Sequence, residues 1–229
     1  MDGLDLDIIV RTAPYLFGQG LVFTMKLTVI STLGAVVLGT LLAMMRLSSM
    51  RLLSSVAGAY VNLMRALPLI LIIFWFYFLV PYIVGWVMQA GRPVAVGGFT
   101  SALITFILFE AAYFCEIMRA GIQSIPRGQA DAGYALGLNY WQVMGTVVLP
   151  QAFRNMTPLL LMQMIVLFQD TSLVYVLSLT DFLGAASNVA QRDGRLVEMF
   201  VFAALVYFVI SYTASRVVKR LERRMAIAQ

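Results

Sequence analysis

The sequence predicts an all-α integral membrane protein with five transmembrane helices. Hydrophobic residues make up 61% of its 229 residues, and charged residues only 12%. A soluble domain has roughly 25% charged residues, so this chain is better suited to lipid than to a water-facing surface. Uncharged stretches also recur along the chain, and each is long enough, at roughly 20 residues, to cross a hydrocarbon core about 30 Å thick. We therefore expect one transmembrane domain over residues 1–229.

The absence of charge locates the spans, because an ionised side chain costs roughly 2.5–3.5 kcal/mol at the centre of an inserted helix. The expected spans are residues 20–45, 66–88, 98–118, 158–179 and 197–218. Pro68 is expected to open the second span. Thr157 and Pro158 are expected to open the fourth, as the N-cap and the first helical position.

Basic residues predict the orientation of these spans. With the N-terminus outside, the inner side holds Arg46, Arg51, Arg65, Arg119, Arg127, Arg154, Arg216, Lys219, Arg220, Arg223 and Arg224. The outer side then holds only Arg11, Arg92, Arg192 and Arg195. The excess of basic residues on the inner side places the C-terminus in the cytoplasm. The acidic start MDGLDLD does not resemble the basic start of a secretory signal peptide.

The chain has one cysteine and no histidine. A disulfide needs a second thiol, and the usual zinc and iron sites need cysteine or histidine ligands. We therefore expect no metal site and no Cys–His catalytic residue. We also expect no other catalytic residue, no cofactor in this chain and no nucleic-acid partner.

The predicted cytoplasmic loop, residues 119–154, is unusually long for a connection and too apolar to be disordered. Residues 129–136 are compatible with a helix that ends at Gly137. Residues 141–148 look like a second short helix, stopped before Pro150 because the residue preceding proline avoids the α region. The loop is thus expected to form a helical hairpin, which by itself could be purely structural.

The loop also contains a spaced motif. Asp-Ala-Gly stands at residues 131–133, Gly137 follows after three intervening residues, and Val-x-Leu-Pro stands at residues 147–150. This pattern resembles the Glu-Ala-Ala-x3-Gly-x9-Ile-x-Leu-Pro signature of ABC-importer permease subunits, with conservative departures at positions 131, 133 and 147. A literal Glu-Ala-Ala at residues 110–112 lies inside the third span without the matching spacing.

The resemblance extends along nearly the whole chain. YVNLMRALPL, LPQAFRNMTPLL and QDTSLVYVLSL resemble successive landmarks of the polar amino-acid permease family, and MRLSS, FEAAY and EIMRAGIQSI look most like glutamate/aspartate permease subunits. The resemblance implies a type I ABC importer permease fold in a bacterial inner membrane. It also implies that the chain forms half of a translocation pathway for polar amino acids, with glutamate or aspartate expected.

The resemblance further implies that the hairpin couples to a separate cytoplasmic ATPase, which binds ATP and magnesium. This chain lacks the Gly-x4-Gly-Lys-Ser/Thr phosphate loop and is not itself expected to be an enzyme. The other implied partners are an identical or homologous permease and an extracytoplasmic substrate-binding protein. The expected coupling residues are Arg127, Asp131, Ala132, Gly133, Tyr134, Leu136, Gly137, Leu149 and Pro150.

Ionisable residues inside predicted spans are functional candidates by default. Lys26 could instead extend its ammonium group to the interface, and Glu116 could pair with Arg119 three residues later. Glu110 could either line the pathway or make a hydrogen bond within the bundle. The candidate pathway residues are Glu110, Gln163, Gln169, Asp170, Thr171 and Ser172.

Other readings of the sequence remain open. An ATP-independent secondary transporter, a channel subunit or a membrane scaffold would also be rich in apolar helices, but none of them requires the long spaced hairpin. The mixed-charge segment 180–198 is interpreted as a solvated outer connection, with docking of the binding protein as the alternative.

Overall fold

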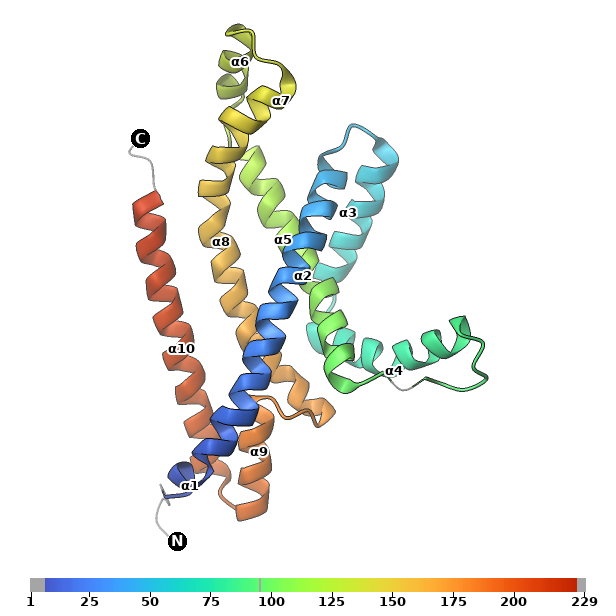
Figure 1. The fold of residues 1–229 in the computed structure, drawn as a ribbon, viewed down its shortest axis with the longest axis vertical. Coiled ribbons are helices and arrows are strands. Elements are labelled where there is room, and N and C mark those ends of the chain that lie inside the picture. Colours follow the sequence, from blue (N-terminus) through green and yellow to red (C-terminus); the bar gives the residue numbers. More distant parts are fainter. Residues whose placement is uncertain (1–6, 95, 226–229) are drawn as a thin grey trace.

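The computed structural model describes residues 7–94 and 96–225, which form helices and connecting turns with no strand. Four long helices run along the long axis of the molecule (Figure 1). They are α2 (Val22–Leu47), α5 (Gly98–Gln123), α8 (Leu149–Asp170) and α10 (Leu196–Met225). Within the described ranges, five helical segments are long and apolar enough to cross a membrane. The all-α membrane fold is confirmed.

The first long helix begins earlier than the charge pattern suggested. α1 (Asp7–Tyr15) and the π-helical turn η1 (Leu16–Leu21) run directly into α2, so that Asp7–Leu47 forms one helical segment of 41 residues. Ile8 and Leu16 are fully buried in a cluster that also contains residues of α9. Tertiary packing therefore stabilises α1 and η1 as helix, although their charged residues led us to expect that the span begins only at residue 20.

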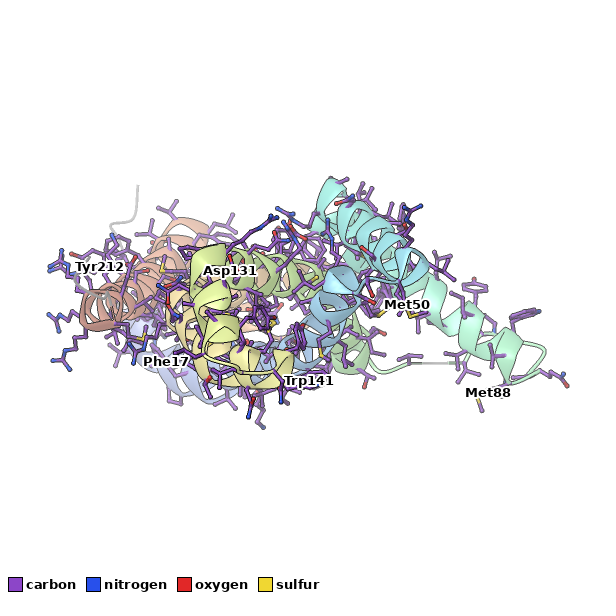
Figure 2. The ribbon with its side chains drawn as sticks, turned by 90° about the horizontal axis from the view of Figure 1, so that it is seen from above. Phe17, Met50, Met88, Asp131, Trp141 and Tyr212 are labelled. Atoms are coloured by element: carbon purple, nitrogen blue, oxygen red, sulfur yellow. The ribbon has the colours of Figure 1, made fainter. Side chains whose placement is uncertain are left out.

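The second expected span is preceded by a helix that we did not expect, α3 (Arg51–Ala66). The chain then turns at Pro68, as expected, into α4 (Leu69–Val87). α4 projects away from the other helices in Figure 1, and Figure 2 shows Met88 at its far end. Few of its apolar side chains are therefore fully buried.

Two expected helix boundaries around the fourth span are wrong. α7 (Tyr140–Val143), the π-helical turn η2 (Met144–Val148) and α8 form one uninterrupted helical run, so the helix does not stop before Pro150 and does not start at Thr157. Pro150 lies directly after the π-helical turn η2, an irregularity of the kind that accommodates a proline inside a helix. The Thr157 hydroxyl donates to the Phe153 carbonyl at 2.6 Å, as in a helix interior, and does not cap an N-terminus.

The segment after α8 is also more ordered than a solvated connection. A 3₁₀ turn, η3 (Thr171–Leu177), leads to α9 (Phe182–Asp193). Asp181 is fully buried, and its carboxylate accepts hydrogen bonds of 3.0 Å from the N–H groups of Leu183 and Gly184. The Phe182 N–H donates to the Thr24 hydroxyl of α2 at 3.0 Å. Asp181 thus caps a helix that packs on the bundle, and the expected solvated loop is wrong for this part.

α2 and α5 cross closely along their length. Ala35, Ala111, Ala112 and Cys115 are fully buried in a shared cluster at this contact. At Gly39 the backbones are so close that an added Cβ would lie 2.8 Å from the Phe114 Cβ and 3.1 Å from the Ala111 carbonyl oxygen. Small residues allow this approach, as is usual where membrane helices meet.

One carboxylate joins three helices near this contact. Glu116 of α5 forms ion pairs with Arg46 of α2, with Arg65 of α3 at 3.7 Å and with Arg119 of its own helix at 2.8 Å. The Glu116–Arg119 pair confirms the prediction from their spacing. The Glu116 side chain is only 16% exposed, and its charge lets three guanidinium groups lie close together.

We expect Gly39→Ala to lower the free energy of unfolding by about 1–3 kcal/mol, because the new methyl group would push against the backbone of α5. Thermal unfolding in detergent measures this. The matched control is Gly58→Ala in α3, where the nearest atom to an added Cβ is the Arg46 Nε at 3.9 Å. Alanine favours a helix over glycine by about 0.5–1 kcal/mol, so the control should not be destabilised. Equal melting temperatures for Gly39→Ala and wild type would contradict the close crossing.

We expect Glu116→Gln to lower the free energy of unfolding by about 1–2 kcal/mol. The amide keeps the shape of the side chain, but it cannot balance three positive charges in a partly solvent-screened site. Asp193→Asn is the control, because it breaks the exposed ion pair with Arg192 and should change stability little. Denaturant or thermal unfolding at low and high salt compares the two. The interpretation fails if both variants behave alike.

Candidate functional site

The predicted hairpin is present and lies at one extreme end of the molecule (Figure 1), called here the hairpin end. Its first arm is α6 (Arg127–Ala135) and its second arm begins with α7. Gly137 has a φ of +82°, and its N–H donates to the Tyr134 carbonyl at 2.9 Å. The Leu138 N–H donates to the Gly133 carbonyl at 3.2 Å. Gly137 therefore ends the first arm as expected, because glycine adopts positive φ without strain.

A capping box that we had not identified fixes the start of the second arm. The Asn139 side chain accepts from the Gln142 N–H at 3.0 Å, and the Gln142 side chain accepts from the Asn139 N–H at 2.9 Å. The sequence signal was a capping residue followed three positions later by glutamine. The bend between the arms is thus held from both sides, which makes the hairpin a defined body.

The structure divides the nine expected coupling residues by exposure. Leu149 is half-buried, and the exposed ones are Arg127, Asp131, Ala132, Tyr134, Leu136, Gly137 and Pro150. Gly133 is buried, and an added Cβ would lie 2.9 Å from the Val143 Cγ2. It therefore lets the two arms pack on each other and does not lie on the outer surface of the hairpin.

Apolar side chains gather at the tip of the hairpin, and we call Tyr134, Leu136, Tyr140 and Trp141 the tip surface. Leu136 is 82% exposed and Trp141 is 80% exposed. Trp141 packs edge-to-face on Tyr140, with ring centroids 5.2 Å apart. Figure 2, which looks down on this end, shows Asp131 on the first arm and Trp141 on the second. Exposed large aromatic and aliphatic groups on a fixed hairpin are typical of a protein-binding surface.

A second candidate site lies inside the bundle, between α5 and α8. Glu110 is fully buried, and the Gln163 side chain donates to its Oε2 at 2.9 Å. Its other oxygen, Oε1, has no hydrogen-bond partner among the described residues. Tyr113 lies one turn further along α5 than Glu110. The guanidinium group of Arg65, from α3, lies 5.5 Å from the centre of the Tyr113 ring. The structure thus brings two of the expected pathway residues, Glu110 and Gln163, into contact and leaves one oxygen of the Glu110 carboxylate free to accept a hydrogen bond.

The remaining pathway candidates, residues 169–172, stand where α8 tightens into η3. Gln169 is exposed, while Asp170 and Ser172 are half-buried. Thr171 is fully buried and donates to the Phe168 carbonyl at 2.7 Å. The four polar residues therefore face different directions. Thr171 is satisfied within its own helix, so it is the weakest pathway candidate of the four.

Comparison with known proteins agrees with this architecture. The family model of the binding-protein-dependent transport system inner membrane component matches residues 35–227. The glutamate/aspartate import permease protein GltK of Escherichia coli O6:H1 is 52% identical, and the alignment covers 97% of this chain and 98% of that protein. The arginine transport system permease protein ArtQ of Bacillus subtilis is 30% identical, with 97% of each chain covered.

A solved structure is similar over the same extent. A chain in the crystal structure of an amino acid ABC transporter with histidines superposes with a TM-score of 0.87 at 30% identity, covering 97% of this chain and 99% of that one. The hairpin, the apolar helices and these matches lead to one conclusion. The chain belongs to the family of binding-protein-dependent transport system inner membrane components, and it is a membrane-spanning subunit of an ABC importer.

Proposed function

We propose that this chain forms half of the translocation pathway of an ATP-driven importer for glutamate and aspartate. The substrate class is supported by the identity with a glutamate/aspartate import permease over nearly the whole of both chains. The main support for the coupling mechanism is the tip surface, whose exposed apolar side chains stand on a fixed hairpin that projects beyond the bundle. ATP hydrolysis belongs to a separate subunit, which binds ATP and magnesium, because this chain has no phosphate-binding loop.

The hairpin is placed to act as a lever on the bundle. Its second arm continues without a break through η2 into α8 and η3, so Tyr140–Leu177 is one helical run of 38 residues. At 1.5 Å per residue such a run spans roughly 57 Å. Gln163 and residues 169–172 lie on it. A displacement of the tip surface by an ATPase would therefore reach the contact between Gln163 and Glu110.

We propose that the pathway runs beside this contact. The free oxygen of Glu110 can accept a hydrogen bond from the ammonium group that all amino acids share. The exposed amide of Gln169 can donate to a carboxylate. Because Glu110 is fully buried within this subunit, a substrate would reach it only after a movement of the helices around it.

The orientation and the other partners follow from the same proposal. The hairpin end faces the cytoplasm, which agrees with the excess of basic residues in the segments at that end. The opposite end, which carries α1 and α9 and is called here the α9 end, faces a substrate-binding protein. A second permease, identical or homologous, supplies the other half of the pathway, since five spans enclose only one side of it. We place the complex in the bacterial inner membrane.

The proposal is tested by glutamate uptake into proteoliposomes that contain the permease pair, the ATPase and the binding protein. We expect ATP-dependent uptake by the wild type. Leu136→Asp should lower the rate by about tenfold or more, because it puts a charge into the apolar contact with the ATPase. Leu136→Met is the matched control and should stay close to wild type. ATP-independent uptake would favour a secondary transporter, and normal uptake by Leu136→Asp would remove the hairpin from coupling.

For the pathway, we expect Glu110→Gln to lower the uptake rate by about tenfold or more, which corresponds to the loss of one charged hydrogen bond to the substrate. Thr105→Val serves as the control, because this buried hydroxyl of α5 donates to the Ser101 carbonyl of its own helix and is not a pathway candidate. The melting temperature of each variant separates lost transport from lost folding. Gln169→Ala and Asp170→Asn are measured alongside, and unchanged kinetics in both would exclude residues 169–172 from the pathway.

A further inference from the structure

A hollow on the surface near the α9 end is lined by a positively charged side chain, Lys26, that has no role in the sites described so far. Its volume is about 460 Å³, and it lies between the N-terminal helical segment and the start of α5. The residues that line it are Gly18, Gln19, Val22, Phe23, Lys26 and Phe99. The Phe23 and Phe99 rings meet edge-to-face, with centroids 5.3 Å apart, and form a firm apolar wall.

Lys26 brings a positive charge to a helix that is otherwise uncharged up to Arg46. Its side chain is exposed, and no ion pair holds its ammonium group within the described part of the chain. Helical side chains lean toward the N-terminus of their helix. Lys26 therefore leans toward Phe23 and toward Gln19, which lies two turns earlier on the same face and is also exposed.

The backbone around Gln19 leaves room for a ligand. Residues Leu16–Leu21 form the π-helical turn η1, a distortion frequent at functional sites. An added Cβ at Gly18 would meet nothing within 4 Å. The hollow therefore stays open beside the amide of Gln19.

The position of Lys26 along the bundle places it close to the proposed pathway. The next residue, Leu27, is fully buried in a cluster with Leu167 and Val174. These two residues flank the polar segment 169–172 on the α8–η3 run. Lys26 thus lies at about the same level of the bundle as that segment.

The chemistry of the hollow selects the charge of its ligand. An ammonium group and an amide donor beside two aromatic rings favour a carboxylate with a short aliphatic stem. The same ammonium would repel the amino group of a basic substrate. We propose that Lys26 and Gln19 bind the side-chain carboxylate of an acidic amino acid as it enters from the α9 end. This inference rests on the proposed function, and it makes Lys26 a determinant of substrate selectivity.

The test measures ATP-dependent glutamate uptake by the complete reconstituted importer, with saturating amounts of glutamate-loaded binding protein. Lys26→Met removes the charge, keeps an unbranched side chain of similar length and suits a membrane helix, and we expect it to lower the maximal rate by about tenfold. Lys26→Arg should stay within about twofold, because it keeps the charge. The matched control, Arg92→Met, removes another exposed cation outside the hairpin end and should leave the rate unchanged.

Unchanged uptake by Lys26→Met would overturn the inference and indicate that Lys26 only reaches for the membrane interface. An equal loss in Arg92→Met would also overturn it, since a general effect of charge would explain both. If Lys26→Met does not assemble, Gln19→Leu decides, and a normal rate in that exposed variant overturns the inference. In each of these cases the wild type still shows ATP-dependent uptake, so the proposed function stands. Without that uptake, the proposed function fails first.

Discussion

The structure depends on a constraint of the membrane interior, where every backbone N–H and C=O group must find its partner inside the protein. An uninterrupted helix satisfies this requirement, and Tyr140–Leu177 remains helical although Pro150 and Pro158 lie within it. Pro150 follows the π-helical turn η2, so the helical run changes its pitch there without breaking. The same continuity joins the exposed hairpin to the buried centre of the bundle.

The two halves of the bundle have different packing. α2 and α5 meet through small residues, and the ion pairs of Glu116 attach α3 to them, so these helices form a fixed frame. α8 faces this frame across the hydrogen bond between Gln163 and Glu110. This arrangement, a long helix beside a fixed frame, is compatible with the lever proposed above for the hairpin. The buried carboxylate of Glu110, with its free oxygen, lies at the boundary between this frame and α8.

Local signals were sufficient for part of the fold and of the candidate site. The end of the first arm at Gly137 and the pair of Glu116 with Arg119 both follow from residues close in sequence. The contacts of Glu116 with Arg46 and Arg65 could not be predicted, since they join helices from distant parts of the chain. The interior position of Gly133 also depends on the second arm, because only Val143 across the bend explains why that position needs a glycine.

The sequence alone determined that the chain is helical and suited to a membrane, and where its hairpin bends, because charge depletion and glycine geometry act locally. It did not determine how far each helix extends. Asp7–Leu47 is longer than its uncharged stretch, and α8 continues through two prolines that read as boundaries. Tertiary packing decided these extents and also folded residues 182–193 into a helix over the capping Asp181. The physical reason is that burial against neighbouring helices stabilises segments whose own composition favours an end.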